Sequence, residues 1–306
     1  MKKQSILLTT LFVGFVLGVF YFSGRQEVFA QKASGPERPL VSRTSSSTRT
    51  EASRSSAFAA EASANSASRA ALAWPFGGKM QRGWEIYVPL ISHTIGTEEG
   101  AGTTDFAMAL SKWQGGKGLP ATGVMDDATM TAFVKHWQSQ RLGRATTPAS
   151  DALMSAPIAD FWDSGRDANM LQLERETYVA YKRMLAEAAK DLDGQLRFTP
   201  DGELAPGEKF LRIVSAFRSP EYQAALRKRE PGAGRAALAK NSPHFTGQAL
   251  DVYVGGEPVT TKDANRLIQV QTPAYKWLVK NASKFGFYPY FYEPWHWEYV
   301  PARLAK

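Results

Sequence analysis

The sequence predicts a chain of the α+β class, in which helices accompany a small sheet. Residues 104–142 and 167–190 have apolar side chains spaced by three and four, which is typical of amphipathic helices. Residues 250–254 have apolar side chains at alternate positions, which is typical of a half-buried strand. A second apolar run, residues 210–215, is followed by a helix-start signal and is also predicted to be a strand.

Length and cysteine content restrict the classes of protein. A chain of 306 residues indicates about two domains, with ample length for a sizeable core. The chain has no cysteine, which excludes a disulfide scaffold, a thiolate zinc finger, a cysteine nucleophile and an iron–sulfur cluster. Any metal site must therefore use carboxylates and the four histidines.

The formal net charge of +8 invites a nucleic-acid or anionic-surface interpretation. Residues 1–72 hold nine Lys and Arg against four Asp and Glu, a net charge of +5. Residues 73–306 hold 28 against 25, a net charge of +3. The larger part of the chain is nearly balanced, so nucleic acid is disfavoured as a partner.

Residues 1–30 are predicted to direct export. Lys2 and Lys3 precede an apolar run of 17 residues, 6–22, and Val28 and Ala30 suit signal cleavage after Ala30. The apolar run is at the lower length limit for a membrane span. Two interpretations stay open, a cleaved signal peptide and a retained anchor in the inner membrane. Under both, we expect the rest of the chain in the periplasm or cell envelope.

Residues 31–73 are predicted to be a disordered tether. From residue 42 to residue 71, 26 of 30 residues are Ser, Thr, Ala or Arg. Such a tract has too few large apolar side chains to offset the entropy lost on ordering. We expect order to begin near Trp74.

Residues 74–145 are predicted to form a small helical module. Gly118 and Pro120 separate its two amphipathic stretches, and Asp127 is the expected cap of the second helix. The apolar faces consist of Phe106, Ala109, Leu110 and Trp113 in the first helix, and of Met130, Phe133, Val134 and Trp137 in the second.

The module resembles the peptidoglycan-binding-like three-helix module of cell-wall hydrolases. The shared marks are Trp113-Gln114, Thr122-Gly123-Val124 with Asp126 and Thr129, and Trp137-Gln138. The resemblance implies that the module binds wall polymer. Any two amphipathic helices with tryptophan in their core would give the same pattern without that function.

A strand-to-helix turn follows residues 210–215. Ser219 is a good helix N-cap and Pro220 suits the first helical position. Arg218 therefore lies on the turn between strand and helix, where a guanidinium can point into a cleft.

Two of the four histidines lie close in sequence to a carboxylate. Asp251 projects from its predicted strand on the side opposite to the apolar face. Gly247 permits a tight bend that can bring His244 back towards Asp251. Pro294 argues against a helix around His296, and an extended chain directs this imidazole away from the tryptophans on both sides of it.

The residue types in these segments suit a catalytic metal. Two imidazoles and one carboxylate, His244, His296 and Asp251, leave a fourth tetrahedral position open, as in catalytic zinc sites. The helical motif with two histidines four residues apart is absent. A water activated by a metal still needs a proton acceptor. Glu293 is the favoured base, because the turn after it can direct it towards the metal, and Glu298 is the alternative.

These segments resemble the zinc D-alanyl-D-alanine carboxypeptidase family, whose fold is related to that of the hedgehog signalling domain. Three family patterns are met in order along the chain. The first, Ser-x-x-Arg-Ser with a following Gln, is met by Ser215, Arg218, Ser219 and Gln223. The second, Ser-x-His-x-x-Gly-x-Ala-x-Asp, is met by Ser242, His244, Gly247, Ala249 and Asp251, and the third, Glu-x-Trp-His, by Glu293, Trp295 and His296.

The resemblance covers residues from about 167 to 302. It implies that residues 146–306 form a catalytic domain with a small antiparallel sheet and flanking helices. It also implies Zn²⁺ on the two histidines and the aspartate named above, with Glu293 as the base. Arg218 is implied to hold the carbonyl or terminal carboxylate of the substrate, and Gln223 and Ser242 to make further polar contacts.

The implied reaction is hydrolysis of the terminal D-Ala–D-Ala amide of a peptidoglycan stem peptide, with stem peptide and wall polymer as partners. Several bonds could be cut by the same residues, so an L,D-carboxypeptidase, a D,D-dipeptidase and an L-Ala–D-Glu endopeptidase stay open as alternatives. A non-catalytic wall-binding protein with a retained zinc site is a further alternative, and the intact Glu293 argues against it.

Overall fold

The structure is a computed structural model that describes residues 57–143, 146–229 and 242–303. All of them belong to one compact unit of the chain. The predicted export segment, residues 1–30, lies outside the described residues, and so do residues 31–56 of the predicted tether. Among the helices of the described ranges, none combines the length and apolar character that a membrane span needs.

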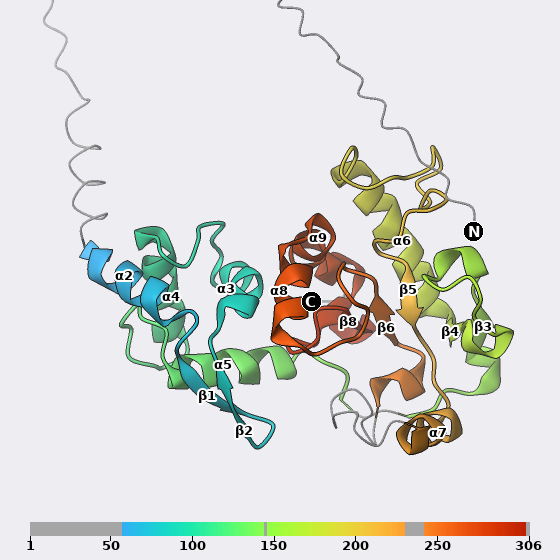
Figure 1. Ribbon diagram of the computed structural model, residues 1–306, viewed down its shortest axis with the longest axis horizontal. Coiled ribbons are helices and arrows are strands. Elements are labelled where there is room, and N and C mark those ends of the chain that lie inside the picture. Colours follow the sequence, from blue (N-terminus) through green and yellow to red (C-terminus); the bar gives the residue numbers. More distant parts are fainter. Residues whose placement is uncertain (1–56, 144–145, 230–241, 304–306) are drawn as a thin grey trace, which may run out of the picture. The chain divides into compact units, whose positions relative to one another are not determined.

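The amino-terminal part of this unit is mostly helical (Figure 1). Its helices and strands are α2 (Ala59–Ser68), β1 (Ala73–Phe76), β2 (Lys79–Arg82), α3 (Val88–Ile95), α4 (Thr104–Gly116) and α5 (Asp127–Gln138). β1 and β2 form an antiparallel hairpin. α4 and α5 occupy the two stretches in which the apolar spacing predicts helices. The cap of α5 is Asp126 rather than Asp127, since the Asp126 side chain accepts a hydrogen bond from the Thr129 amide (2.7 Å).

Helix α2 lies inside the segment predicted to be a disordered tether, so the predicted start of order near Trp74 is wrong. Alanine, which is abundant here, has the highest helix propensity of all residues. Asn65 ties the helix to the turn before α5: its side chain donates to the Gly123 carbonyl (2.8 Å) and accepts from the Met125 amide (2.7 Å). Asn65 is fully buried by these contacts.

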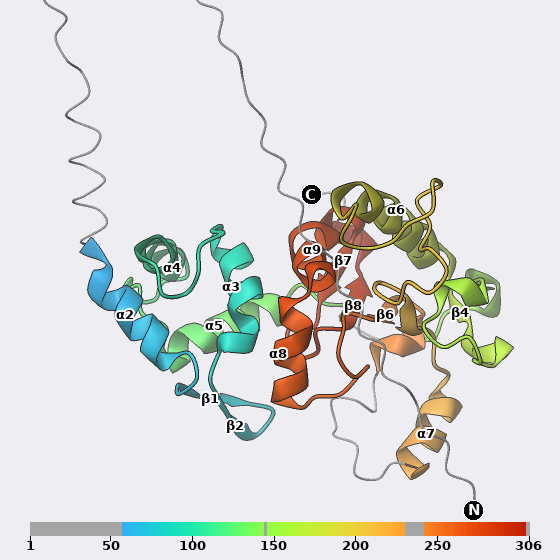
Figure 2. The same ribbon diagram turned by 45° about the horizontal axis from the view of Figure 1, so that its top comes forward.

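The carboxy-terminal part contains a four-stranded antiparallel sheet in the order β5-β6-β8-β7. Its strands are β5 (Ile213–Ser215), β6 (Ala249–Val252), β7 (Phe287–Pro289) and β8 (His296–Tyr299), and its helices are α6 (Arg175–Asp191), α7 (Pro220–Arg229), α8 (Asp263–Gln271) and α9 (Pro273–Asn281). Both views show β6 and β8 side by side (Figures 1 and 2), and Figure 1 shows β5 beside β6. The α+β class and the small antiparallel sheet with flanking helices are confirmed.

Two predicted elements are shorter than expected. The helix predicted over 167–190 begins only at Arg175, because β4 (Gln172–Glu174) pairs antiparallel with β3 (Leu153–Ser155). Glu174 then caps α6 by accepting a hydrogen bond from the Thr177 amide (2.7 Å). The strand predicted over 210–215 is reduced to β5, since Leu211 has a positive φ of 66° that interrupts the extended chain.

One aromatic cluster joins the two parts of the unit. The ring of Phe291 lies 4.8 Å from that of Phe76, 5.6 Å from that of Trp137 and 5.7 Å from that of Tyr87. Phe291 is buried, and it belongs to a continuous apolar core that runs from Trp74 to the last strand. The helical part and the sheet therefore share one core within the described residues.

Candidate metal centre

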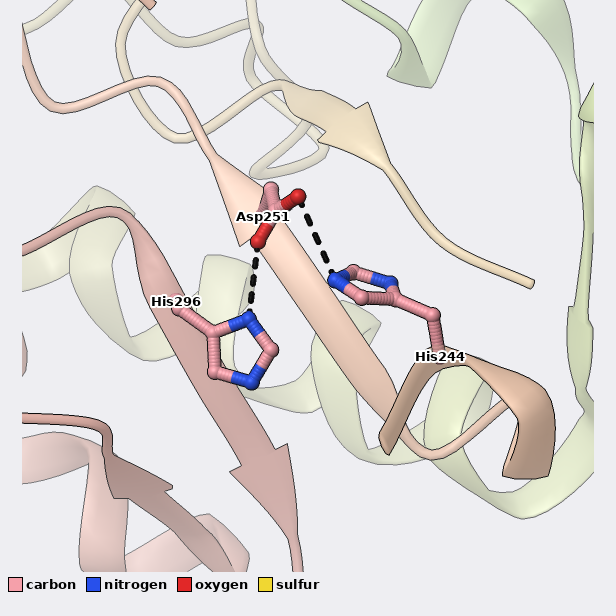
Figure 3. Close-up of side chains that lie close together, drawn as sticks. All are labelled: His244, Asp251 and His296. Atoms are coloured by element: carbon pink, nitrogen blue, oxygen red, sulfur yellow. Dashed lines mark hydrogen bonds and ion pairs between the residues drawn. The ribbon is translucent and has the colours of Figure 1, made fainter. Parts of the chain in front are cut away.

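Two neighbouring strands and the turn before one of them bring His244, Asp251 and His296 together. Asp251 on β6 is directly paired with His296 on β8. His296 Nδ1 lies 2.9 Å from Asp251 Oδ1, and His244 Nε2 lies 3.3 Å from Asp251 Oδ2 (Figure 3). One donor atom from each residue lies within 4.8 Å of the other two, and all three side chains are buried.

The orientation of His244 follows from its local backbone. It lies in a 3₁₀ turn, Pro243–Thr246, that Ser242 caps: the Ser242 hydroxyl accepts from the His244 amide (3.4 Å). His244 Nδ1 lies 2.6 Å from the carbonyl oxygen of Ala216. A carbonyl only accepts, so Nδ1 carries the proton and Nε2 keeps its lone pair, which faces Arg218 Nη2 at 3.3 Å and is available to a metal.

Gly247 ends this turn with a φ of +70°, as the predicted bend requires. A Cβ at this position would lie 2.8 Å from the amide nitrogen of Glu174. Any other residue would therefore push the turn away from β4 and move His244 with it.

The charges around the centre favour metal-ligating protonation states on two of the three residues. Burial, and then the nearby Arg218, lowers the pKa of His244 to about 4, so the imidazole is neutral. Burial raises the pKa of Asp251, but His244, His296 and Arg218 together hold it well below its usual range. Burial lowers the pKa of His296, yet its hydrogen bonds to Asp251 and Glu298 raise it to about 9.

Arg218 lies on the predicted turn between β5 and α7 and contacts the centre directly. Its Nη2 donates to Asp251 Oδ2 (2.6 Å), and its Nε donates to Ser215 Oγ (2.8 Å). Its backbone amide donates to the His244 carbonyl (3.2 Å). The side chain is 12% exposed against 2% for Asp251, so its guanidinium is the more accessible of the two charges.

The two candidate bases have opposite surroundings. Glu293 is buried, and its Oε1 has no hydrogen-bond partner among the described residues. Burial raises the pKa of Glu293 to about 7. Glu298 accepts from His296 and Arg141, and despite its burial these contacts lower its pKa to about 2. Glu293 thus has the free oxygen and the higher basicity, which favours it over Glu298 as a proton acceptor.

The remaining sequence candidates lie around the same turn. Gln223 is buried on α7, one turn after Ser219, whose hydroxyl caps that helix by accepting from the Tyr222 amide (3.1 Å). Ser242 is buried at the start of the His244 turn. The contacts of Ser242 show a local structural role, and no contact of either side chain tests the predicted substrate binding.

One set of contacts at the centre was not predicted from the sequence. Arg141 and Leu142, just after α5, bind the carboxylate of Glu298 on β8. They are more than 150 residues from Glu298 in the chain, and no motif connects them. The spacing of residues along the sequence therefore could not predict this contact.

The donor set fits a zinc ion. Two imidazole nitrogens and one carboxylate oxygen converge from a strand pair and a fixed turn, which leaves a fourth position for water or substrate. His296 also has a carboxylate, that of Glu298, at its second ring nitrogen (3.1 Å), and metal-ligating histidines usually have such a partner. The buried, unpartnered oxygen of Glu293 is a third feature that suits a water-activating centre.

Comparison with known proteins agrees with this geometry. Residues 170–302 match the model of a family described as D-alanyl-D-alanine carboxypeptidase (VanY). The match confirms the resemblance to the zinc D-alanyl-D-alanine carboxypeptidase family for this part of the chain, and with it a peptidoglycan-related peptidase type. It does not extend to residues 74–145, so wall binding by the helical module stays a prediction. A search of curated proteins found no match.

Proposed function

We propose that this protein is a zinc-dependent D-alanyl-D-alanine carboxypeptidase that trims peptidoglycan stem peptides in the cell envelope. The observation that carries the proposal is the convergence of His244, Asp251 and His296 within 4.8 Å, beside a buried carboxylate with a free oxygen. A purely structural metal site would have no use for Glu293.

Three residues are assigned as metal ligands, and Glu293 is assigned as the base. His244 Nε2, Asp251 and His296 Nδ1 would hold Zn²⁺, which supplies Lewis acidity to the scissile carbonyl and to the attacking water. Glu293 accepts the proton of that water and then donates it to the leaving amine of the terminal D-Ala. Burial raises the pKa of Glu293 above its usual range, which makes this carboxyl the better proton acceptor of the two candidates.

Arg218 is assigned to orient the substrate. Arg218 lies at the exposed edge of the triad and carries a fixed positive charge. A guanidinium binds a carboxylate or a developing oxyanion with charge-assisted hydrogen bonds. Arg218 is therefore assigned to the terminal carboxylate or carbonyl oxygen of the stem peptide. Gln223 and Ser242 are assigned to polar contacts with the same peptide.

The cellular setting belongs to the same proposal. Residues 1–30 would export the chain to the periplasm or cell envelope, either as a cleaved signal or as an inner-membrane anchor. The helical module would hold the catalytic part against wall polymer. Its resemblance to wall-binding modules supports this role.

Mass spectrometry of defined stem peptides tests the reaction. Tetrapeptide, pentapeptide and free D-Ala–D-Ala are incubated with zinc-loaded protein, with chelator-treated protein, and with chelator-treated protein after zinc is restored. We expect loss of one D-Ala from the pentapeptide, abolished by chelation and recovered with zinc. Cleavage of the tetrapeptide, hydrolysis of free D-Ala–D-Ala or cutting after L-Ala would instead identify one of the alternative peptidases, and no cleavage of any substrate would favour a binding protein.

Glu293→Gln separates catalysis from metal binding. The amide has the shape of the carboxylate but cannot accept the proton, so turnover of the cleaved peptide should fall by about 100-fold or more while zinc stays bound. Glu257→Gln is the matched control, because Glu257 is an exposed carboxylate on the same domain. Unchanged turnover in Glu293→Gln would reject the assignment of the base.

A further inference from the structure

A contact through Glu298 joins the helical module to the candidate metal centre. We propose that Arg141 is a positioning residue for the metal ligand His296, acting through Glu298. The inference rests on the proposed function, because it concerns how this chain holds His296 for a metal. It adds a role for residues that lie outside the segment matched by the family.

Glu298 links the two parts. Its side chain is fully buried on β8, and each of its oxygens is bound. Oε1 accepts from Arg141 Nε (2.9 Å) and Nη2 and lies 3.1 Å from His296 Nε2. Oε2 accepts from the backbone amide of Leu142 (2.8 Å). Three donors from the module and one from the centre therefore fix this carboxylate.

The fixed carboxylate of Glu298 determines which ring nitrogen of His296 carries a proton. An ionised carboxylate only accepts, so the Nε2 of His296 must carry a proton that it donates to Glu298. The opposite nitrogen, Nδ1, faces Asp251 at 2.9 Å and shares a proton with it in the metal-free protein; a metal would replace that proton, so Nδ1 is the atom that would ligate. A carboxylate at the second ring nitrogen also orients the ring and raises ligand basicity, and its loss typically weakens metal binding by about 10- to 100-fold.

Arg141 holds the carboxylate of Glu298 next to His296. A buried carboxylate without a cationic partner is strongly destabilising. Arg141 is itself held by two further contacts: its Nη1 donates to Gln138 Oε1 (2.9 Å), and its guanidinium carbon lies 4.0 Å from the ring centroid of Tyr290. Its side chain is 19% exposed. The end of α5 thus presents a fixed guanidinium to the metal centre, so docking of the module and retention of metal become linked.

Zinc affinity measured by competition with a chromophoric chelator tests the inference. We expect Arg141→Ala to weaken zinc binding by about 10- to 100-fold, and Arg141→Lys to recover part of the loss, because lysine restores the charge without the paired donors. Arg303→Ala is the matched control: Arg303 donates to the Ser139 carbonyl of the same segment but makes no contact with Glu298 among the described residues. Its zinc affinity should stay within about twofold of the wild type.

A second readout separates positioning from general loss of structure. The visible spectrum of the cobalt-substituted protein reports ligand geometry, and it should change in Arg141→Ala and not in Arg303→Ala. If Arg141→Ala fails to fold, Arg141→Lys still must bind zinc more weakly than Arg303→Ala does. Wild-type zinc affinity and an unchanged cobalt spectrum in the Arg141 variants would overturn the inference and leave the proposed function intact. A wild-type protein that binds no zinc would overturn both.

Discussion

Glu293 and Glu298 lie three and two residues from His296, and their environments drive their pKa values in opposite directions. Burial without a partner raises the pKa of Glu293 to about 7. Bonds from His296 and Arg141 outweigh burial and lower the pKa of Glu298 to about 2. When neighbouring carboxyls are separated in this way, the one with the raised pKa is suited to proton transfer and the other to holding a charge.

The raised pKa of Glu293 predicts a pH-dependent stability in the metal-free protein. A carboxyl that titrates near 7 when folded and near 4.5 when unfolded retains a proton in the folded state that the unfolded state loses. Its contribution is therefore favourable below pH 4.5 and is lost as the pH rises through 7, by roughly 3 kcal/mol. Glu293→Gln should remove this loss, so that urea unfolding shows a larger gain over wild type at pH 8 than at pH 5. Equal gains at both pH values would contradict the buried, unpartnered state of Glu293.

At the residue scale, sequence reasoning was strongest where a motif fixed both residue type and order. The approach of His244 to Asp251 was predicted because a strand and a glycine bend restrict where their side chains can point, whereas His296 was joined to them by the ligand set of catalytic zinc sites and by the family resemblance. The partner of Glu298 was not predicted, because its contact with Arg141 depends on how two distant elements pack. Glu298 itself was noticed only as a competing base, since its sequence position near His296 gives no information on its donors.

At the element scale, α2 shows how one composition suits two structures. A Ser-, Ala- and Thr-rich tract has few large apolar side chains and is typical of a disordered segment. The same tract contains the alanines that favour a helix. Two buried hydrogen bonds from Asn65 distinguish the two outcomes, because they join α2 to the turn between α4 and α5.

Asn65→Ala tests the role of that contact. The substitution removes both bonds of the buried side chain to the Gly123 carbonyl and the Met125 amide, so we expect a loss of about 2–4 kcal/mol in unfolding free energy. Ser63→Ala, at an exposed position of the same helix, should change stability by less than about 0.5 kcal/mol. Urea unfolding monitored by tryptophan fluorescence measures both variants. Equal stability of the two would show that α2 behaves as a tether.

Long-range pairing also explains why helix and strand boundaries were less predictable than the elements themselves. The helical spacing before Arg175 was real in the sequence, yet residues 172–174 pair with β3 instead. The Glu174 amide then donates to the Gly247 carbonyl (3.0 Å) and braces the turn of His244. Local periodicity cannot indicate that residues 172–174 will pair with a strand about 20 residues earlier in the chain.

At the scale of the whole described unit, the helical part and the sheet are not separate building blocks. Phe291 lies among aromatic rings of the module and only two residues before the proposed base, Glu293. Arg266 on α8 donates to the Tyr87 hydroxyl (3.0 Å) and to the Tyr292 carbonyl (3.1 Å), so it ties the module to the same loop. Removal of residues 74–145 would therefore disturb the loop that carries Glu293 as well as any wall binding.

Phe291→Ala tests whether the two parts unfold together. Loss of this buried ring from a shared aromatic core should lower the unfolding free energy by about 3–5 kcal/mol. Since the ring contacts both parts, tryptophan fluorescence and zinc release should still change at one common urea concentration, shifted downwards. Phe291→Leu keeps most of the apolar volume and should lose clearly less stability than Phe291→Ala. A wild-type protein whose fluorescence and zinc release have separate midpoints would instead show a module that folds independently of the metal centre, and the shared core would then carry little of the stability of either part.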